Sequence, residues 1–268
     1  RFRNKLRVLR KTAQFTSQKK IIEADPFMHL LYMTNAADFV KEHSLSKGTD
    51  KYLSKALYST TFSAVHEMNA FSFLQYLLPL ITPIFTFTFK KTTMISSFQD
   101  TIVLDSVKDI CYTNNHYKIK TNMGVYYSKN LVLATEISWS SRFAGVQEMN
   151  MPVATHMLHV RGEPKPIIAK KAYHLFCHPS MVQSIANLGD GTYLFYSKDQ
   201  QQPLEFYFTN PQVIAHHFWD PAGRINGHVL IESNRGNHMY LIGDYNIVGL
   251  EEAYITGLHA ANQIITSS

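Results

Sequence analysis

Cysteine is scarce in this chain. The 268 residues contain only Cys111 and Cys177, so no framework of disulfides is needed for folding and no oxidising compartment is required, although a single bridge between the two stays open. The glycines lack one arrangement. No Gly-x-Gly-x-x-Gly follows a strand pattern, and the single Gly-x-Gly, at residues 189–191, falls in a predicted hairpin. These residues therefore contain no phosphate-cradling glycine loop of that type.

Acidic residues are missing from the start of the chain. Residues 1–20 hold eight of the 26 Lys and Arg residues and no Asp or Glu. The pattern predicts a solvated basic helix or arm over residues 1–24. Contact with anionic lipid, contact with nucleic acid and a targeting remnant are the alternatives, of which nucleic acid is the least favoured. The first residue is Arg1 and not methionine, as expected of a processed or partial chain. The compartment stays unknown; an intracellular site, organellar or at a membrane periphery, is the expectation.

Charge is also absent from residues 71–89, a run of nineteen residues that is long enough to span a membrane. Pro79 and Pro83 would interrupt a single helix, and Phe85, Phe87 and Phe89 alternate with threonines as in a strand. We therefore predict a buried helix, a turn and a strand that lines an apolar cavity. Shallow docking on a membrane, or a true span, are the alternatives.

The most informative stretch is residues 239–262. Met239 to Ile242 is a short apolar run that ends at Gly243-Asp244, which predicts a buried strand followed by a turn. From Leu250 the apolar and small residues recur at helical spacing, with two glutamates in the first turn, where carboxylates oppose the positive end of the helix dipole. A strand that leads into a helix N-terminus predicts a site for an electron-rich ligand.

These residues resemble the C-terminal FAD motif of the flavin-containing amine oxidase superfamily, which includes amine oxidases, protoporphyrinogen oxidases and carotene desaturases. The resemblance implies FAD as cofactor and hydride transfer from an amine or lipophilic substrate to the flavin N5. It also implies that Asp244, beside Gly243, binds the ribityl chain, and that the helix start presents backbone N–H groups to the pyrimidine edge of the ring. The residues of that helix start are Gly249, Leu250 and Glu251.

Residues 102–136 contain five short apolar or alternating runs, separated in part by asparagine-rich turn signals. They predict a β-meander that feeds a buried parallel strand, an order of elements that also resembles the family. The resemblance implies that the backbone of Val107 touches the adenine and that Ala134-Thr135 runs beside the adenosine half of FAD.

The fold class that we predict is α/β (α+β), with a doubly wound FAD-binding domain completed by the C-terminal strand and helix, and a mixed helical and β-sheet substrate domain. Trp219 and Tyr245 are candidates for the wall of the substrate cavity; packing in an interdomain core is the alternative for Trp219. The predicted segments are the basic arm 1–24, the helical part of the substrate domain 25–100, the meander and strand of the FAD domain 101–145, the β-rich substrate domain 146–235, and the C-terminal strand and helix 236–268.

Two functions remain open at this level. The first is an FAD-dependent oxidoreductase whose pyrophosphate loop comes from a partner chain or a missing segment. The second is a non-catalytic relative that serves as a structural or assembly subunit, within a membrane-associated complex or elsewhere. The catalytic residue stays unassigned, since the lysines in the relevant region are not distinguished from surface lysines. No metal site is predicted, because in a single strand His174 and His178 share a face but stand too far apart to chelate one ion easily, and Cys177 points to the other face.

Overall fold

The computed structural model describes residues 1–81, 90–169 and 171–267. The helices are α1 (Phe2–Thr12), α2 (Gln18–Ala24), α3 (Pro26–Met33), α4 (Ala36–Glu42), α5 (Ser46–Gly48), α6 (Ser54–Thr61), α7 (Ala70–Leu77), α8 (Lys91–Ser96), α9 (Ile137–Ala144) and α10 (Leu250–Thr266). The strands are β1 (Val107–Thr113), β2 (His116–Thr121), β3 (Val125–Ser128), β4 (Leu131–Leu133), β5 (Met151–Pro164), β6 (Tyr173–Leu175), β7 (Val182–Asn187), β8 (Thr192–Ser197), β9 (Phe208–Asn226) and β10 (Met239–Leu241). The mixed α/β class predicted from the sequence is confirmed.

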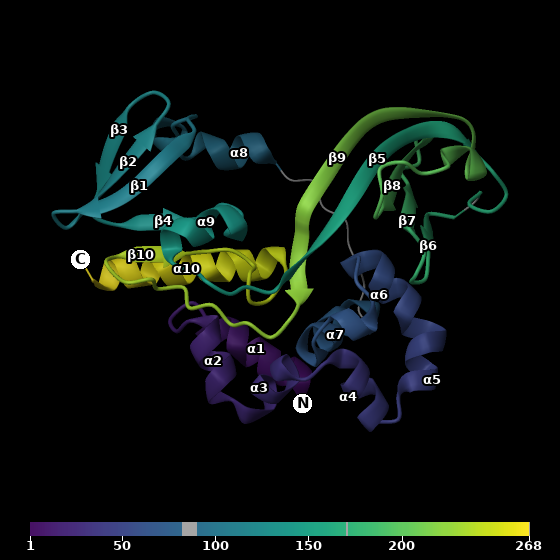
Figure 1. Cartoon of the computed structure of the whole chain (residues 1–268), viewed down its shortest axis with the longest axis horizontal. Helices are drawn as coiled ribbons and strands as arrows, with labels where there is room; N and C mark the ends of the chain where they lie inside the picture. Colours follow the sequence, from purple (N-terminus) through teal and green to yellow (C-terminus); the bar gives the residue numbers. More distant parts are fainter. Residues whose placement is uncertain (82–89, 170, 268) are drawn as a thin grey trace.

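The centre of the fold is the parallel pair β4 and β10, in which Leu131 lies opposite Met239 and Leu133 opposite Leu241. Two other sheets accompany this pair in the part of the chain that the structure describes: an antiparallel β1-β2-β3 meander and an antiparallel sheet of order β6-β7-β8-β5-β9. Figure 1 shows α10 lying along β4 and β10, with α1, α2 and α3 on its other side, and the long β5–β9 ribbon reaching from this region to β6, β7 and β8.

Polar caps start several of the short helices. Asp25 accepts hydrogen bonds from the amides of Phe27 and Met28, and Pro26 occupies the first position of α3, where its missing N–H costs nothing. Asn35 and Asn69 cap α4 and α7 in the same way. Hydrophobic spacing in the sequence predicts one helix over residues 27–40 and another over residues 51–80, and the structure divides both. The first breaks at Thr34, and the second breaks after Thr61, where Phe62 adopts φ 60°.

Residues 1–24 form α1 and α2, so the predicted basic segment is helical; the correction is that one face of α1 is buried and not solvated. Phe2, Leu6 and Leu9 are buried in a core that also contains Ile255 of α10. Their spacing of four and three residues places them on one face of a helix. The abundant basic residues concealed this apolar stripe, because they occupy the other face of the same helix.

The uncharged run 71–89 begins as predicted. α7 and a following 3₁₀ turn at Leu78–Ile81 form the helical part, and Phe71 and Phe73 are fully buried. The predicted strand at residues 85–89 lies outside the described residues. Within the described ranges, no helix is both long enough and apolar enough to cross a membrane.

The meander is confirmed as β1, β2 and β3, followed by β4. One predicted run is wrong: Ile102, Val103 and Leu104 precede β1 without forming a strand and are exposed. The alternation at residues 204–208 also predicts a strand from the sequence, but Leu204–Phe206 is a 3₁₀ turn and β9 begins at Phe208. In both places apolar residue types resembled a strand where no partner strand is available.

Candidate functional site

The carboxyl ends of β4 and β10 meet at a cavity of about 280 Å³. Because the two strands are parallel, the loops that follow them lie at the same edge, which is where α/β folds bind ligands. Residues 134–137 follow β4, residues 242–245 follow β10, Ala253 comes from α10, and residues 221–224 come from the end of β9. The volume lies just below the range of about 300–1,000 Å³ typical of ligand sites.

Gly243 and Asp244 occupy the turn between β10 and α10. Gly243 has φ 143°, a conformation that favours glycine, and its amide donates to Thr256 Oγ1 at 2.9 Å. Among the described residues, only the Gly249 amide donates to the exposed Asp244 carboxylate, at 3.2 Å. Burial, with a smaller contribution from the Asp244 charge, raises the pKa of Tyr76 in α7 to about 12. Asp244 is therefore held by the start of α10 and keeps acceptor capacity for a ligand.

The opposite wall is built from Ala134-Thr135 and Glu136. Thr135 Oγ1 and Ser140 Oγ share a hydrogen bond of 2.6 Å. Glu136 caps α9, accepting from the Ser138 amide at 2.7 Å and from the Trp139 amide at 3.3 Å. Burial acts to raise the pKa of Glu136, but the Ser138 hydrogen bonds and the Arg224 charge outweigh it and lower that pKa. The carboxylate is thus ionised at neutral pH.

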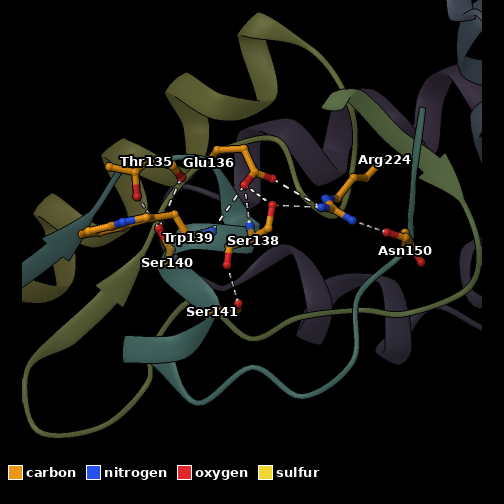
Figure 2. Close-up of polar contacts among 8 residues, drawn as sticks. All are labelled: Thr135, Glu136, Ser138, Trp139, Ser140, Ser141, Asn150 and Arg224. Carbon is orange, nitrogen blue, oxygen red and sulfur yellow. Dashed lines mark hydrogen bonds and ion pairs between the residues drawn. The ribbon is translucent and has the colours of Figure 1, made fainter. Parts of the chain in front are cut away.

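Arg224 joins this wall to the end of β9 and is only 8% exposed. Figure 2 shows its guanidinium between Glu136, Ser138 and Asn150. One terminal nitrogen donates to the Asn150 carbonyl at 2.8 Å; the other lies 3.3 Å from Glu136 Oε1 and 3.2 Å from Ser138 Oγ. Its Nε is buried and makes no hydrogen bond with the described residues. The cavity therefore contains one fixed cation, paired with Glu136.

Asn150 connects the cavity to the helical layer. Its side chain accepts from the Val229 amide at 2.8 Å and donates to the hydroxyl of Tyr32 at 3.0 Å. Tyr32 is fully buried in α3, and its hydroxyl has the Asn246 carbonyl at 2.9 Å as acceptor. Burial raises the pKa of Tyr32 to about 12, although the Asn150 hydrogen bond opposes it, so the hydroxyl stays a donor at neutral pH.

Replacing Tyr32 with phenylalanine is expected to lower the free energy of unfolding by about 1–3 kcal/mol, because buried polar groups of Asn150 and Asn246 lose a partner. The folded-state pKa lies above the unfolded value of 10, so this stabilisation is present below pH 10 and is lost as the pH rises toward about 12. Urea unfolding measures the change. Tyr52→Phe, at a residue that is 68% exposed, should change little; equal effects at the two positions would contradict the network.

The structure brings together five of the residues predicted from the sequence: Ala134, Thr135, Gly243, Asp244 and Tyr245 all line the cavity. Tyr245 is buried, and its hydroxyl donates to the Leu241 carbonyl at 2.8 Å, so it supports the turn and has no proton to offer a substrate. Burial raises its pKa strongly.

The other predicted residues lie elsewhere. Val107 starts β1 at the surface and is not in the cavity lining. Trp219 is 40% exposed on β9, with its ring 6.1 Å from that of Tyr196, and is also absent from the lining. Gly249 and Leu250 begin α10 outside the lining, and the Glu251 carboxylate forms an ion pair with Arg10 at 2.7 Å. Any role of this helix start would therefore rest on its backbone.

Sequence reasoning missed Glu136 and Arg224. Glu136 lies just after the predicted strand, at a position where a polar residue can cap a following helix. The prediction considered only the strand and did not consider this cap. Arg224 gave a weaker signal, as a cation between Gly223 and the buried Ile225. Within the described part of the chain, no group of three or more His, Cys, Asp or Glu side chains is placed to hold a metal ion.

No protein-family model and no curated protein sequence matches the chain. Solved structures do. A fatty acid isomerase from P. acnes matches with a TM-score of 0.61 and 11% identity, over 89% of this chain and 67% of that one. A protein assigned as a protoporphyrinogen oxidase from an Exiguobacterium species matches with a TM-score of 0.58 and 11% identity, over 87% and 66%. Cyclohexylamine oxidase from Brevibacterium oxydans matches with a TM-score of 0.54 and 12% identity, over 99% and 74%.

The chain shares the fold of these proteins. The resemblance predicted from the C-terminal motif is thereby confirmed at the level of fold, across most of the chain and not only at residues 239–262. The chain spans 66% of the length of the Exiguobacterium protein and 67% of that of the isomerase. At identities of 11–12%, this likeness concerns the fold alone.

Proposed function

We propose that this chain belongs to an FAD-dependent oxidoreductase of the amine oxidase type, which oxidises an amine or a lipophilic substrate. The observation that carries the proposal is the convergence of Ala134-Thr135 and Gly243-Asp244 on one cavity beside the N-terminal turn of α10. The order of elements and the fold likeness to an amine oxidase support it. A flavin, when bound, supplies the hydride acceptor; the residues of the chain supply binding, orientation and electrostatics.

The residues present fit part of FAD. Asp244 offers a carboxylate with spare acceptor capacity, suited to a ribityl hydroxyl, and Gly243 allows the backbone to turn beside it. The first amides of a helix have no partner within the helix, and the helix dipole is positive at this end, so the N-terminal turn of α10 favours the electron-rich pyrimidine edge. The fit does not extend to the pyrophosphate, because the chain has no Gly-x-Gly-x-x-Gly loop. We propose that a partner chain or a further segment supplies that loop.

Replacing Asp244 with asparagine is expected to weaken FAD binding about tenfold or more. A hydrogen bond to a charged acceptor contributes about 1.5–3 kcal/mol, and each 1.4 kcal/mol is tenfold in affinity. FAD fluorescence, titrated with purified protein, measures the change. Asp50→Asn, at an exposed acid without a hydrogen-bond partner among the described residues, is the matched control. Equal affinities for wild type, Asp244→Asn and Asp50→Asn would contradict a flavin role for Asp244.

The absent pyrophosphate loop favours a second candidate function, that of a structural or assembly subunit which has kept the fold without the cofactor. The same titration distinguishes the two. If the chain is a structural subunit, we expect no saturable FAD binding, even when any partner that copurifies with the chain is present. The oxidoreductase predicts binding that strengthens when that partner is added.

A further inference from the structure

We propose that a groove beside α1, separate from the Asp244 cavity, is a binding site for a phosphate-bearing anion. The groove has a volume of about 520 Å³ and lies between α1 and the first turn of α10. Its lining includes four cations, Arg3, Arg7, Arg10 and Lys11, and one carboxylate, Glu251. The inference does not depend on flavin binding at the Asp244 cavity.

The two sites lie on different sides of α10. Glu251 lines the groove and Ala253 lines the Asp244 cavity. Two helical positions separated by two residues point about 200° apart, because each residue turns the helix by about 100°. A ligand in the groove would therefore leave the Asp244 cavity open.

The charges of the groove are unbalanced. Arg10 is paired, with Glu251 at 2.7 Å and with the fully buried Glu252 at 2.6 Å. Arg3, Arg7 and Lys11 are exposed, and across the described ranges none of them pairs with a carboxylate. A fixed guanidinium with three uncompensated cations suits a phosphate, which accepts several charge-assisted hydrogen bonds.

This arrangement works against α1 itself. Arg3, Arg7 and Lys11 follow one another at intervals of four, so like charges stand on adjacent turns of one face, where they repel. The first turn of α1 also lacks an acid and carries Arg3 and Lys5 near the positive end of the helix dipole. The helix forms nevertheless, because Phe2, Leu6 and Leu9 are buried against the core that contains Ile255 of α10. An anion in the groove would remove the repulsion.

The charge distribution of the whole chain points the same way. All 20 Asp and Glu residues lie after residue 20, whereas residues 1–20 hold eight Lys and Arg. The excess positive charge of this protein is thus concentrated on α1 and its surroundings. A soluble phosphate compound and a phosphate lipid headgroup share the chemistry that would satisfy it.

The test uses the whole chain and two probes, inorganic pyrophosphate in calorimetry and phosphatidylcholine vesicles with or without phosphatidic acid in sedimentation. The variant Arg7→Gln/Lys11→Gln removes two groove charges. The control Lys41→Gln/Lys47→Gln removes two exposed charges from α4 and α5. Pyrophosphate should bind the wild type with one-to-one stoichiometry, and the groove variant should bind about tenfold or more weakly.

A folding readout accompanies the binding readout. Removing the repulsion should make the groove variant slightly more resistant to urea than the wild type, while the control should not be. Loss of binding together with a gain in stability in the groove variant supports the site. Binding of pyrophosphate to the wild type indicates a soluble phosphate as ligand. Sedimentation of the wild type only with vesicles that contain phosphatidic acid indicates a lipid headgroup. The proposal is overturned if the wild type binds neither probe, or if the groove variant and the control variant lose the same amount of affinity.

Discussion

Replacing Arg10 with methionine is expected to lower the free energy of unfolding by about 3 kcal/mol at neutral pH, the largest effect of any single substitution that we predict here. Arg10 Nε lies 2.6 Å from Glu252 Oε1, and the Glu252 side chain is fully buried beneath α1. Removing one partner of a buried pair leaves an uncompensated charge, which costs about 3–5 kcal/mol. The lower end applies, because the Arg10 side chain is 29% exposed.

The deficit of Arg10→Met should depend on pH. Burial raises the pKa of Glu252 above 4.5 even though Arg10 opposes that shift, so loss of Arg10 raises it further. At a pH between the unfolded and folded pKa values of Glu252, this carboxyl is protonated in the folded state and ionised in the unfolded state. The free energy of unfolding therefore falls as the pH rises from one pKa value to the other. The deficit should therefore be small below pH 4.5 and grow above it. Urea unfolding across this range measures it, with Arg161→Met, at an exposed residue of β5, as control; a deficit independent of pH would contradict the buried pair.

Replacing Arg224 with methionine is expected to lower the free energy of unfolding by about 2–3 kcal/mol and to weaken FAD binding as well. Its guanidinium satisfies the Asn150 carbonyl and part of Glu136, and a lost hydrogen bond to a charged group costs about 1.5–3 kcal/mol. Because the same side chain fixes the end of β9 against the β4–α9 loop, the cavity should loosen. Urea unfolding and FAD titration measure the two effects.

Two further variants make this prediction specific. Arg224→Lys keeps the charge but cannot reach both partners with a planar fork, so an intermediate loss is expected. Arg161→Met removes an exposed arginine from β5 and should change neither quantity. The pKa of Glu136 is lowered in the folded state. The stabilisation that ionised Glu136 contributes is therefore present above pH 4.5 and is lost as the pH falls through the folded pKa. If Arg224→Met were as stable as Arg161→Met, the contacts of Arg224 with Asn150 and Glu136 would have no energetic role.

The sequence predicted the fold where a pattern was local and strong. The meander, the strand Met239–Leu241 and the helix from Leu250 form as their periodicity indicated. The errors arose where composition obscured a local signal. In α1 the high content of basic residues hid the apolar spacing of a buried face. At Thr34 and Phe62 the apolar composition of the flanking residues hid the ends of the helices. Apolar spacing at residues 2, 6 and 9 was present but masked by the basic face.

The candidate site was predicted in part for a similar reason. Gly243 and Asp244 carry a sequence motif, whereas Arg224 reaches the cavity only because β9 ends beside the β4–α9 loop. Glu136 meets Arg224 across 88 positions of sequence, a contact that depends on the tertiary fold and has no local signal. The network of Asn150 and Tyr32 is likewise set by packing between segments more than a hundred residues apart.

The measurement that tests the central claim most directly is the absorption spectrum of the protein isolated from its source, with any partner chain still attached. Flavin bands in the blue region, with flavin released on denaturation in a ratio of about one to one, are the predicted result. A colourless protein that takes up no added FAD would contradict the oxidoreductase proposal and leave the subunit function in its place.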